Sequence, residues 1–226
     1  AAGMVSAGNS GAVMAGAILV LGRPEGVERP AIVSVLPALK GAPLMLDMGA
    51  VVDCRPVHLV QFALMGEVYS RRVHGVARPR VAILSNGEED TKGTDLTRAA
   101  AAALRRAPID FVGYCEGRDL LTGEVDVIVT DGFTGNVALK TMEGTAKVVG
   151  EYLKRALRST TVSKIGGLLS KAALEGMKKR IDWREVGGAP LLGVNGVGFI
   201  SHGRSDALAV ENAIRRAGDA ARGGRP

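Results

Sequence analysis

The chain has 226 residues, 46% hydrophobic and only 4% aromatic, which is enough to bury one core built mainly of Ala, Val, Leu and Ile. A formal charge of +6 and a pI near 9.6 favour an acidic partner. The aromatic residues are sparse and scattered, which argues against nucleic acid because it leaves no base-stacking platform of the kind that binds RNA or single strands. The distant cysteines Cys54 and Cys115 argue against a disulfide scaffold or a structural zinc site and suit a reducing cytoplasm, and no apolar run approaches the roughly 20 residues of a membrane span.

Short β-branched runs alternate with longer helical patterns along the chain. The strand candidates are 31–35, 44–46, 81–84, 111–112, 125–129 and 197–200. Helical spacing covers 11–21, 57–73, 95–105, 136–157 and 205–217. This alternation predicts an α/β fold with a three-layer, largely parallel sheet and helices on both faces.

These elements are expected to form a single domain, 1–217, followed by a flexible Gly- and Arg-rich tail, 218–226. Within the domain, 160–181 places apolar residues on one helical face and lysines seven residues apart on another. Gly166-Gly167 interrupts the pattern, which predicts a protruding amphipathic helical hairpin. The pattern alone supports a membrane-surface helix and an ordinary core or dimer helix equally.

Four turns, each following an apolar run, place Gly beside Ser, Thr or Asn. They are Ser6–Gly11, Asp47–Ala50, Ser85–Gly93 and Asp131–Asn136. One such turn is more often plain helix capping. Ligands of parallel sheets bind outside the carboxyl ends of the strands, so four turns at the same end of one sheet predict a polar cleft suited to an anion.

The sequence lacks the motifs of several other chemistries. It has no GxGxxG after a strand, no P-loop, no GxSxG and no HExxH. His202, at a strand end before a helix, is a candidate acid, base or phosphate ligand, although a lone histidine is more often structural.

Taken together, seven segments resemble the bacterial phosphate acyltransferases of phospholipid synthesis, in order from Ser6 to about Ala217. The segments are SAGNSGA (6–12), LDMGAVVDC (46–54), GEEDTKG (87–93), EGRDLL (116–121), TDGFTGNVALKTMEG (130–144), GGAPLLG (187–193) and SHGRSDA (201–207). The resemblance implies a fold like that of phosphotransacetylases and isocitrate-type dehydrogenases. It also implies transfer of a long-chain acyl group from acyl carrier protein to inorganic phosphate, by a cytoplasmic, peripherally membrane-associated homodimer without an organic cofactor or metal.

The resemblance assigns chemical roles to three residues. Lys92 would bind phosphate and offset transition-state charge, Asn136 would donate to the oxyanion, and His202 would protonate the departing thiolate. Phosphate or substrate contacts are expected at Ser6, Asn9, Ser10, Asp47, Gly49, Asn86, Asp131, Thr134 and Gly135. The alternative for Lys92 is a solvated lysine paired with the adjoining acids of GEED.

The resemblance also favours the membrane interpretation of the hairpin. The expected membrane contacts are Ile165, Leu168, Leu169, Lys171 and Met177. Two departures stand out: Val51 replaces a usual asparagine, and family members begin with a further segment that carries a DAMGGD-like motif. The alternative functions are a short-chain phosphotransacetylase that uses coenzyme A thioesters and a non-catalytic binding protein derived from the family.

Overall fold

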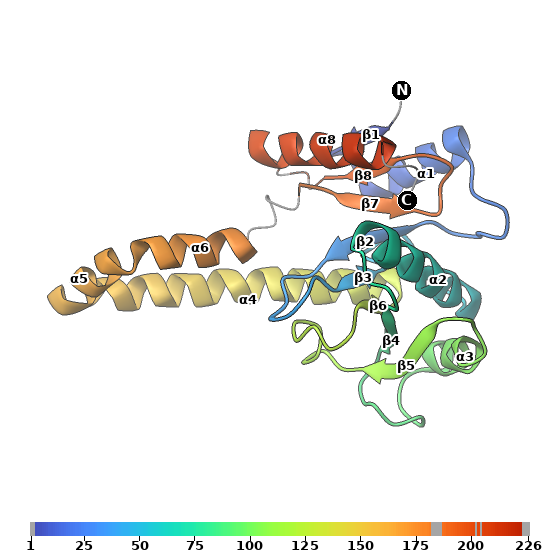
Figure 1. Cartoon of the computed structure of the whole chain (residues 1–226), viewed down its shortest axis with the longest axis horizontal. Coiled ribbons are helices and arrows are strands. Elements are labelled where there is room, and N and C mark those ends of the chain that lie inside the picture. Colours follow the sequence, from blue (N-terminus) through green and yellow to red (C-terminus); the bar gives the residue numbers. More distant parts are fainter. Residues whose placement is uncertain (1–2, 182–186, 202, 204, 223–226) are drawn as a thin grey trace.

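A computed structural model describes residues 3–181, 187–201, 203 and 205–222 and contains one mixed sheet between two layers of helices (Figure 1). The strands are β1 Met4–Ser6, β2 Ala31–Val35, β3 Leu44–Leu46, β4 Arg80–Leu84, β5 Asp110–Cys115, β6 Val127–Val129, β7 Ala189–Leu192 and β8 Gly198–Ile200. The helices are α1 Ser10–Leu21, α2 Pro56–Val73, α3 Asp95–Leu104, α4 Gly132–Arg158, α5 Thr161–Leu169, α6 Lys171–Ile181 and α8 Ala207–Arg222.

The strands follow the order β1-β8-β7-β2-β3-β6-β4-β5. The pairs β1/β8, β3/β6, β6/β4 and β4/β5 are parallel, whereas β2/β3, β2/β7 and β7/β8 are antiparallel. The predicted three-layer α/β architecture is therefore confirmed. Three successive antiparallel pairs lie between β3 and β8, so β1 and β8 run opposite to β3, β6 and β4.

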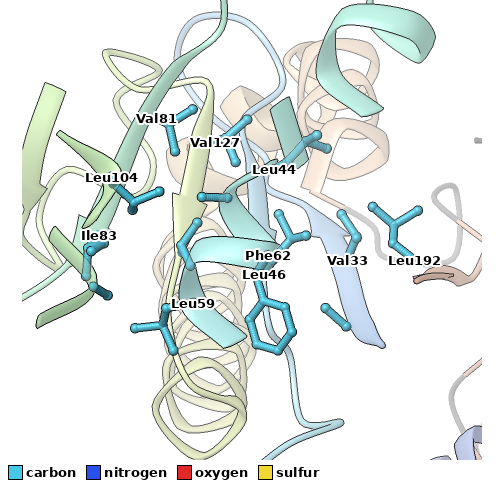
Figure 2. Packing of buried hydrophobic residues seen from close by; sticks show 14 of the residues in the cluster. Val33, Leu44, Leu46, Leu59, Phe62, Val81, Ile83, Leu104, Val127 and Leu192 are labelled. Atoms are coloured by element: carbon cyan, nitrogen blue, oxygen red, sulfur yellow. The ribbon is translucent and has the colours of Figure 1, made fainter. Parts of the chain in front are cut away.

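Successive residues of the central strands face the two helical layers in turn, as the two-residue period of a strand requires. Leu44, Leu46 and Val127 lie on the face covered by α2 and α3, in one cluster with Phe62 of α2 (Figure 2). Met45 and Ile128 face the other way and pack with residues of α1 and α4. Each fully buried side chain of this kind contributes about 1.5 to 3 kcal/mol, so these two faces fix the register of the strands that carry the turns.

Several predicted boundaries differ from the structure. The break in the hairpin lies at Ser170 and not at Gly166-Gly167, because α5 continues through both glycines at a cost of about 1 kcal/mol each. Helix α8 continues to Arg222, beyond the predicted end at Ala217. Strand β7 was not predicted, since it is short and contains Pro190, a residue that disfavours a strand assignment.

Helix α4, with 27 residues, extends beyond the sheet, and α5 and α6 fold back beside it to form an arm (Figure 1). The α5 backbone lies close to α4, because a Cβ on Gly167 would be 3.5 Å from Cβ of Leu157. Over the described residues, no helix is long and apolar enough to cross a bilayer.

Candidate functional site

Three of the four predicted turns lie at one edge of the sheet. They follow β3, β6 and β4, which are adjacent parallel strands, so their carboxyl ends point the same way. These turns are Asp47–Ala50, Asp131–Asn136 and Ser85–Gly93. The structure thus brings Asp47, Lys92 and Asn136 to one edge from three separate parts of the sequence.

The turn Ser6–Gly11 lies elsewhere, so the prediction that all four turns share one end of the sheet is wrong. It follows β1, and its neighbour Ser201 follows β8, both of which run opposite to β3. The Ser201 N–H donates to the Ser6 carbonyl at 2.8 Å. The Ser6 hydroxyl accepts from Gly8, Asn9 caps α1 through the Ala12 N–H, and Ser10 is the first residue of α1.

Asp47 holds the turn after β3 together from inside. Its carboxylate is fully buried and accepts the backbone N–H groups of Ile32 at 2.9 Å, Ala50 at 2.9 Å and Val51 at 2.6 Å. Burial raises the pKa of Asp47, and the backbone donors oppose that rise. A carboxylate enclosed in this way holds the turn in place. We therefore propose a structural role for Asp47 instead of the direct contact with phosphate that the sequence led us to expect.

The start of α4 packs directly on the Asp47 turn. The Gly132 N–H donates to the Val51 carbonyl at 2.8 Å, and a Cβ on Gly135 would lie only 1.9 Å from the Asp47 carbonyl oxygen. Val51 therefore contributes backbone atoms to the turn, while its side chain is buried in the core. The position at which the resemblance leads us to expect an asparagine thus holds a core residue.

Asn136 is the exposed amide at this end of α4. A Cβ on Gly49, whose φ is 121°, would lie 3.6 Å from Cβ and Cγ of Asn136, so the amide stands beside the turn. Asp131 caps the helix, because one carboxylate oxygen accepts the Thr134 N–H at 2.8 Å and the other accepts its hydroxyl at 2.7 Å. Within the described part of the chain, the Asn136 side chain has no hydrogen-bond partner, which leaves its N–H groups available to a substrate oxygen.

Lys92 lies in the turn after β4. Asn86 shapes this turn by accepting the Gly93 N–H at 2.8 Å, and the Lys92 N–H donates to the Glu89 carbonyl at 2.9 Å. The aliphatic part of Lys92 crosses Gly87, where a Cβ would lie 2.6 Å from Cγ of Lys92.

Two of the acids beside Lys92 are paired with arginines. Glu88 binds Arg118 at 3.1 Å, and Asp90 binds Arg105. In the part of the chain that the structure describes, Lys92 itself makes no ion pair. The interpretation of Lys92 as the partner of Glu88 or Asp90 therefore has no support in the geometry. The Glu89 carboxylate does lie near the stem of Lys92, since the same Cβ on Gly87 would be 2.7 Å from Oε2 of Glu89.

His202 lies outside the described residues. Ser205, to which the sequence assigned no role, has a buried hydroxyl without a partner in the described part of the chain. The arginines Arg105 and Arg118 were also missed, although Arg118 lies in the motif EGRDLL.

The surroundings of Cys54, at the end of the Asp47 turn, disfavour a nucleophilic thiolate. Its thiol donates to the Val51 carbonyl at 3.3 Å, and burial with the nearby charge of Asp47 raises its pKa to about 12. Burial likewise raises the pKa of Cys115 to about 12. We expect both thiols to react with a disulfide reagent near pH 8 at least about tenfold more slowly in the folded chain than in denaturant, because reaction requires the thiolate. One rapidly reacting thiol in the folded chain would contradict this.

The sequence of the chain is similar to the sequences of known proteins. The sequence model described as "Fatty acid synthesis protein" matches residues 1–225. The chain is 99% identical over 222 residues to a phosphate acyltransferase of Anaeromyxobacter sp. (strain K), covering 98% of this chain and 62% of that protein. It is 58% identical over 225 residues to a phosphate acyltransferase of Myxococcus xanthus (strain DK1622), covering 98% and 64%. The chain thus spans about three fifths of the length of these relatives.

Two solved structures resemble this one. A phosphotransacetylase from Streptococcus pyogenes has a TM-score of 0.62 at 17% identity, covering 97% of this chain and 63% of that one. The EutD phosphotransacetylase from Staphylococcus aureus has a TM-score of 0.59 at 16% identity, covering 99% and 64%. At these identities the likeness shows a shared fold.

Proposed function

The chain belongs to the fatty acid synthesis protein family, and on that premise we propose that it functions as an acyltransferase, which moves a long-chain acyl group from acyl carrier protein to inorganic phosphate. The main support is its 99% identity to a protein named phosphate acyltransferase. The geometry adds an exposed ammonium, Lys92, and an exposed amide, Asn136, on one edge of the sheet.

The reaction needs little covalent help from the protein. A phosphate oxygen attacks the thioester carbonyl carbon, the C–S bond breaks, and the proton of the phosphate ends on the departing thiolate. The enzyme has to hold an anion beside a carbonyl and to stabilise the negative oxygen of the tetrahedral intermediate.

The proposed roles follow from these needs. Lys92 binds phosphate and offsets the charge that develops in the transition state, and the amide of Asn136 donates to the oxyanion. Asn86, Gly49 and Thr134 shape the edge around them, with the Asn86 oxygen already engaged by Gly93. The group of Ser6, Asn9 and Ser10 lies at the other edge, so we leave it out of this cradle, and His202 remains proposed as the proton donor to the thiolate.

The test is formation of acyl phosphate from palmitoyl-(acyl carrier protein) and inorganic phosphate by the folded chain. Acetyl coenzyme A, as a competing thioester, separates long-chain from short-chain transfer. A folded chain that forms no acyl phosphate, or that prefers acetyl coenzyme A, would overturn the proposal.

We also propose that the tip of the arm lies on an anionic membrane. Helix α5 buries none of its residues, and its apolar side chains Val162, Ile165, Leu168 and Leu169 are all exposed. Leu169 is 81% exposed, so almost its whole apolar side chain is in contact with solvent. Lys171 and Met177 on α6 are exposed as well, and an apolar face with nearby lysines suits a lipid surface.

Replacing Leu168 and Leu169 with glutamate is expected to abolish co-sedimentation with anionic liposomes, because each exposed leucine loses its favourable transfer into lipid and each glutamate is repelled. Thr141→Glu with Thr145→Glu, two exposed positions on α4, is the control that adds the same charge away from the tip. Unchanged sedimentation of the leucine variant, or equal loss in the control, would contradict the membrane role.

A cytoplasmic homodimer is the proposed state of the chain. Its support is a further exposed apolar face on α4, formed by Val148, Val149, Tyr152 and Leu153, which the rest of the arm leaves uncovered. Contiguous exposed apolar faces are typical of interaction surfaces.

A further inference from the structure

The turn that carries Lys92 is strongly acidic, which is unexpected for a phosphate site. Glu88, Glu89 and Asp90 precede Lys92, and Glu116 and Asp119 lie in the loop after the neighbouring strand β5. Phosphate carries a negative charge at neutral pH, so uncompensated carboxylates at this edge would repel it and compete for the ammonium of Lys92.

Two arginines compensate four of these five carboxylates, whereas Glu89 makes no ion pair among the described residues. Arg118, from the loop after β5, contacts Glu88 at 3.1 Å, Glu116 at 3.2 Å and Asp119 at 3.8 Å. Arg105, at the end of α3, binds Asp90. The arginines thus engage four carboxylates around the turn and leave the ammonium of Lys92 without an acidic partner among the described residues.

We propose that Arg118 is a positioning residue for phosphate binding, which acts by holding Glu88 away from Lys92; the inference rests on the proposed function of this edge. Glu88 and Lys92 belong to the same turn, which the bond from the Lys92 N–H to the Glu89 carbonyl closes. Without Arg118, Lys92 is the remaining positively charged residue of that turn with which Glu88 can pair. Pairing between them would withdraw the charge that phosphate needs. Arg105 acts in the same way on Asp90.

The experiment compares phosphate kinetics of the chain with those of Arg118→Ala. We expect the KM for phosphate to rise about threefold or more, the range of an exposed ion pair, while kcat stays within about twofold because Arg118 touches no reacting atom. Arg78→Ala is the control, since Arg78 pairs with Asp110 at 3.1 Å, is also largely exposed and lies before β4, at the opposite end of that strand. Its KM should not change.

A second substitution separates the charge effect from a structural one. Adding Glu88→Gln to Arg118→Ala removes the carboxylate that would be released, so the KM for phosphate should return to within about twofold of the parent value. A KM in Arg118→Ala equal to that in Arg78→Ala would overturn the inference. Failure of Glu88→Gln to restore the KM would also overturn it, because Arg118 would then act only through the structure of the loop.

The inference can fail separately from the proposed function. If the folded parent chain forms no acyl phosphate, the function is overturned, and the same variants are then compared by calorimetric titration with inorganic phosphate. Weaker binding in Arg118→Ala, restored by Glu88→Gln, would support the inference in that case. Equal binding in parent and Arg118→Ala, or no binding by the parent, would overturn it.

Discussion

Replacing Gly135 with alanine is expected to destabilise the chain by about 3 kcal/mol or more. The new Cβ would lie 1.9 Å from the carbonyl oxygen of Asp47 and 3.0 Å from the carbonyl carbon. Both are backbone atoms, which cannot rotate away as a side chain can. Either α4 or the turn after β3 must therefore move, and the hydrogen bonds of the buried Asp47 carboxylate resist movement of the turn.

Gly150→Ala in the same helix is the matched control. A Cβ there meets no atom within 4 Å, so alanine should stabilise α4 by up to about 1 kcal/mol through its higher helix propensity. The two variants make the same chemical change in one helix, and opposite signs are expected. Free energies of unfolding from denaturant titration measure both, and a Gly135→Ala variant as stable as Gly150→Ala would show that the close approach is not required.

The same contact explains one limit of sequence analysis. The helical pattern predicted a start at Asn136, whereas α4 begins at Gly132 and is capped by Asp131. Gly132 and Gly135 have low helix propensity, so the pattern stopped short of them. Their place in the helix is decided by packing on Asp47, which is 85 or more residues away along the chain and leaves no local signal.

Other elements could be predicted to the residue. Strands β2 and β3 match the predicted runs 31–35 and 44–46, because Pro30 and Pro43 mark their starts and apolar side chains fill them. Direction and order in the sheet were not predictable in the same way. Local patterns give no strand direction, so the antiparallel β2 and β7, and with them the separation of the Ser6 turn from Asp47, emerge only from non-local pairing.

In the candidate site, too, local features could be predicted from the sequence and tertiary contacts could not. The residue types around Lys92 and Asn136 were predicted from turn composition and from the resemblance. The ion pairs of Arg105 and Arg118 were not, since they join residues 15 and 30 positions apart from their partners through tertiary structure. The enclosure of Asp47 was missed for the same reason, because a carboxylate after a strand has the same sequence whether it faces a ligand or the protein interior.

Loss of Lys92 or Asn136 is the largest functional effect that we expect. Lys92→Ala and Asn136→Ala should each lower kcat for acyl phosphate formation about a hundredfold or more, the range found when one preorganised donor to a developing oxyanion is removed. Both side chains are exposed and have no partner in the described part of the chain. Their removal should therefore leave the free energy of unfolding within about 0.5 kcal/mol of the parent.

Conservative variants separate the two roles. Asn136→Asp keeps the shape of the side chain but replaces the donor N–H groups with a negative charge beside the Asp47 turn, so it should be at least as inactive as Asn136→Ala. Lys92→Arg keeps the charge and should retain more turnover than Lys92→Ala, although the planar guanidinium presents its donors in a different geometry from the ammonium. Lys40→Ala, which breaks an exposed pair with Glu124, is the control and should keep full turnover. Full activity in both alanine variants would show that Lys92 and Asn136 take no part in the mechanism.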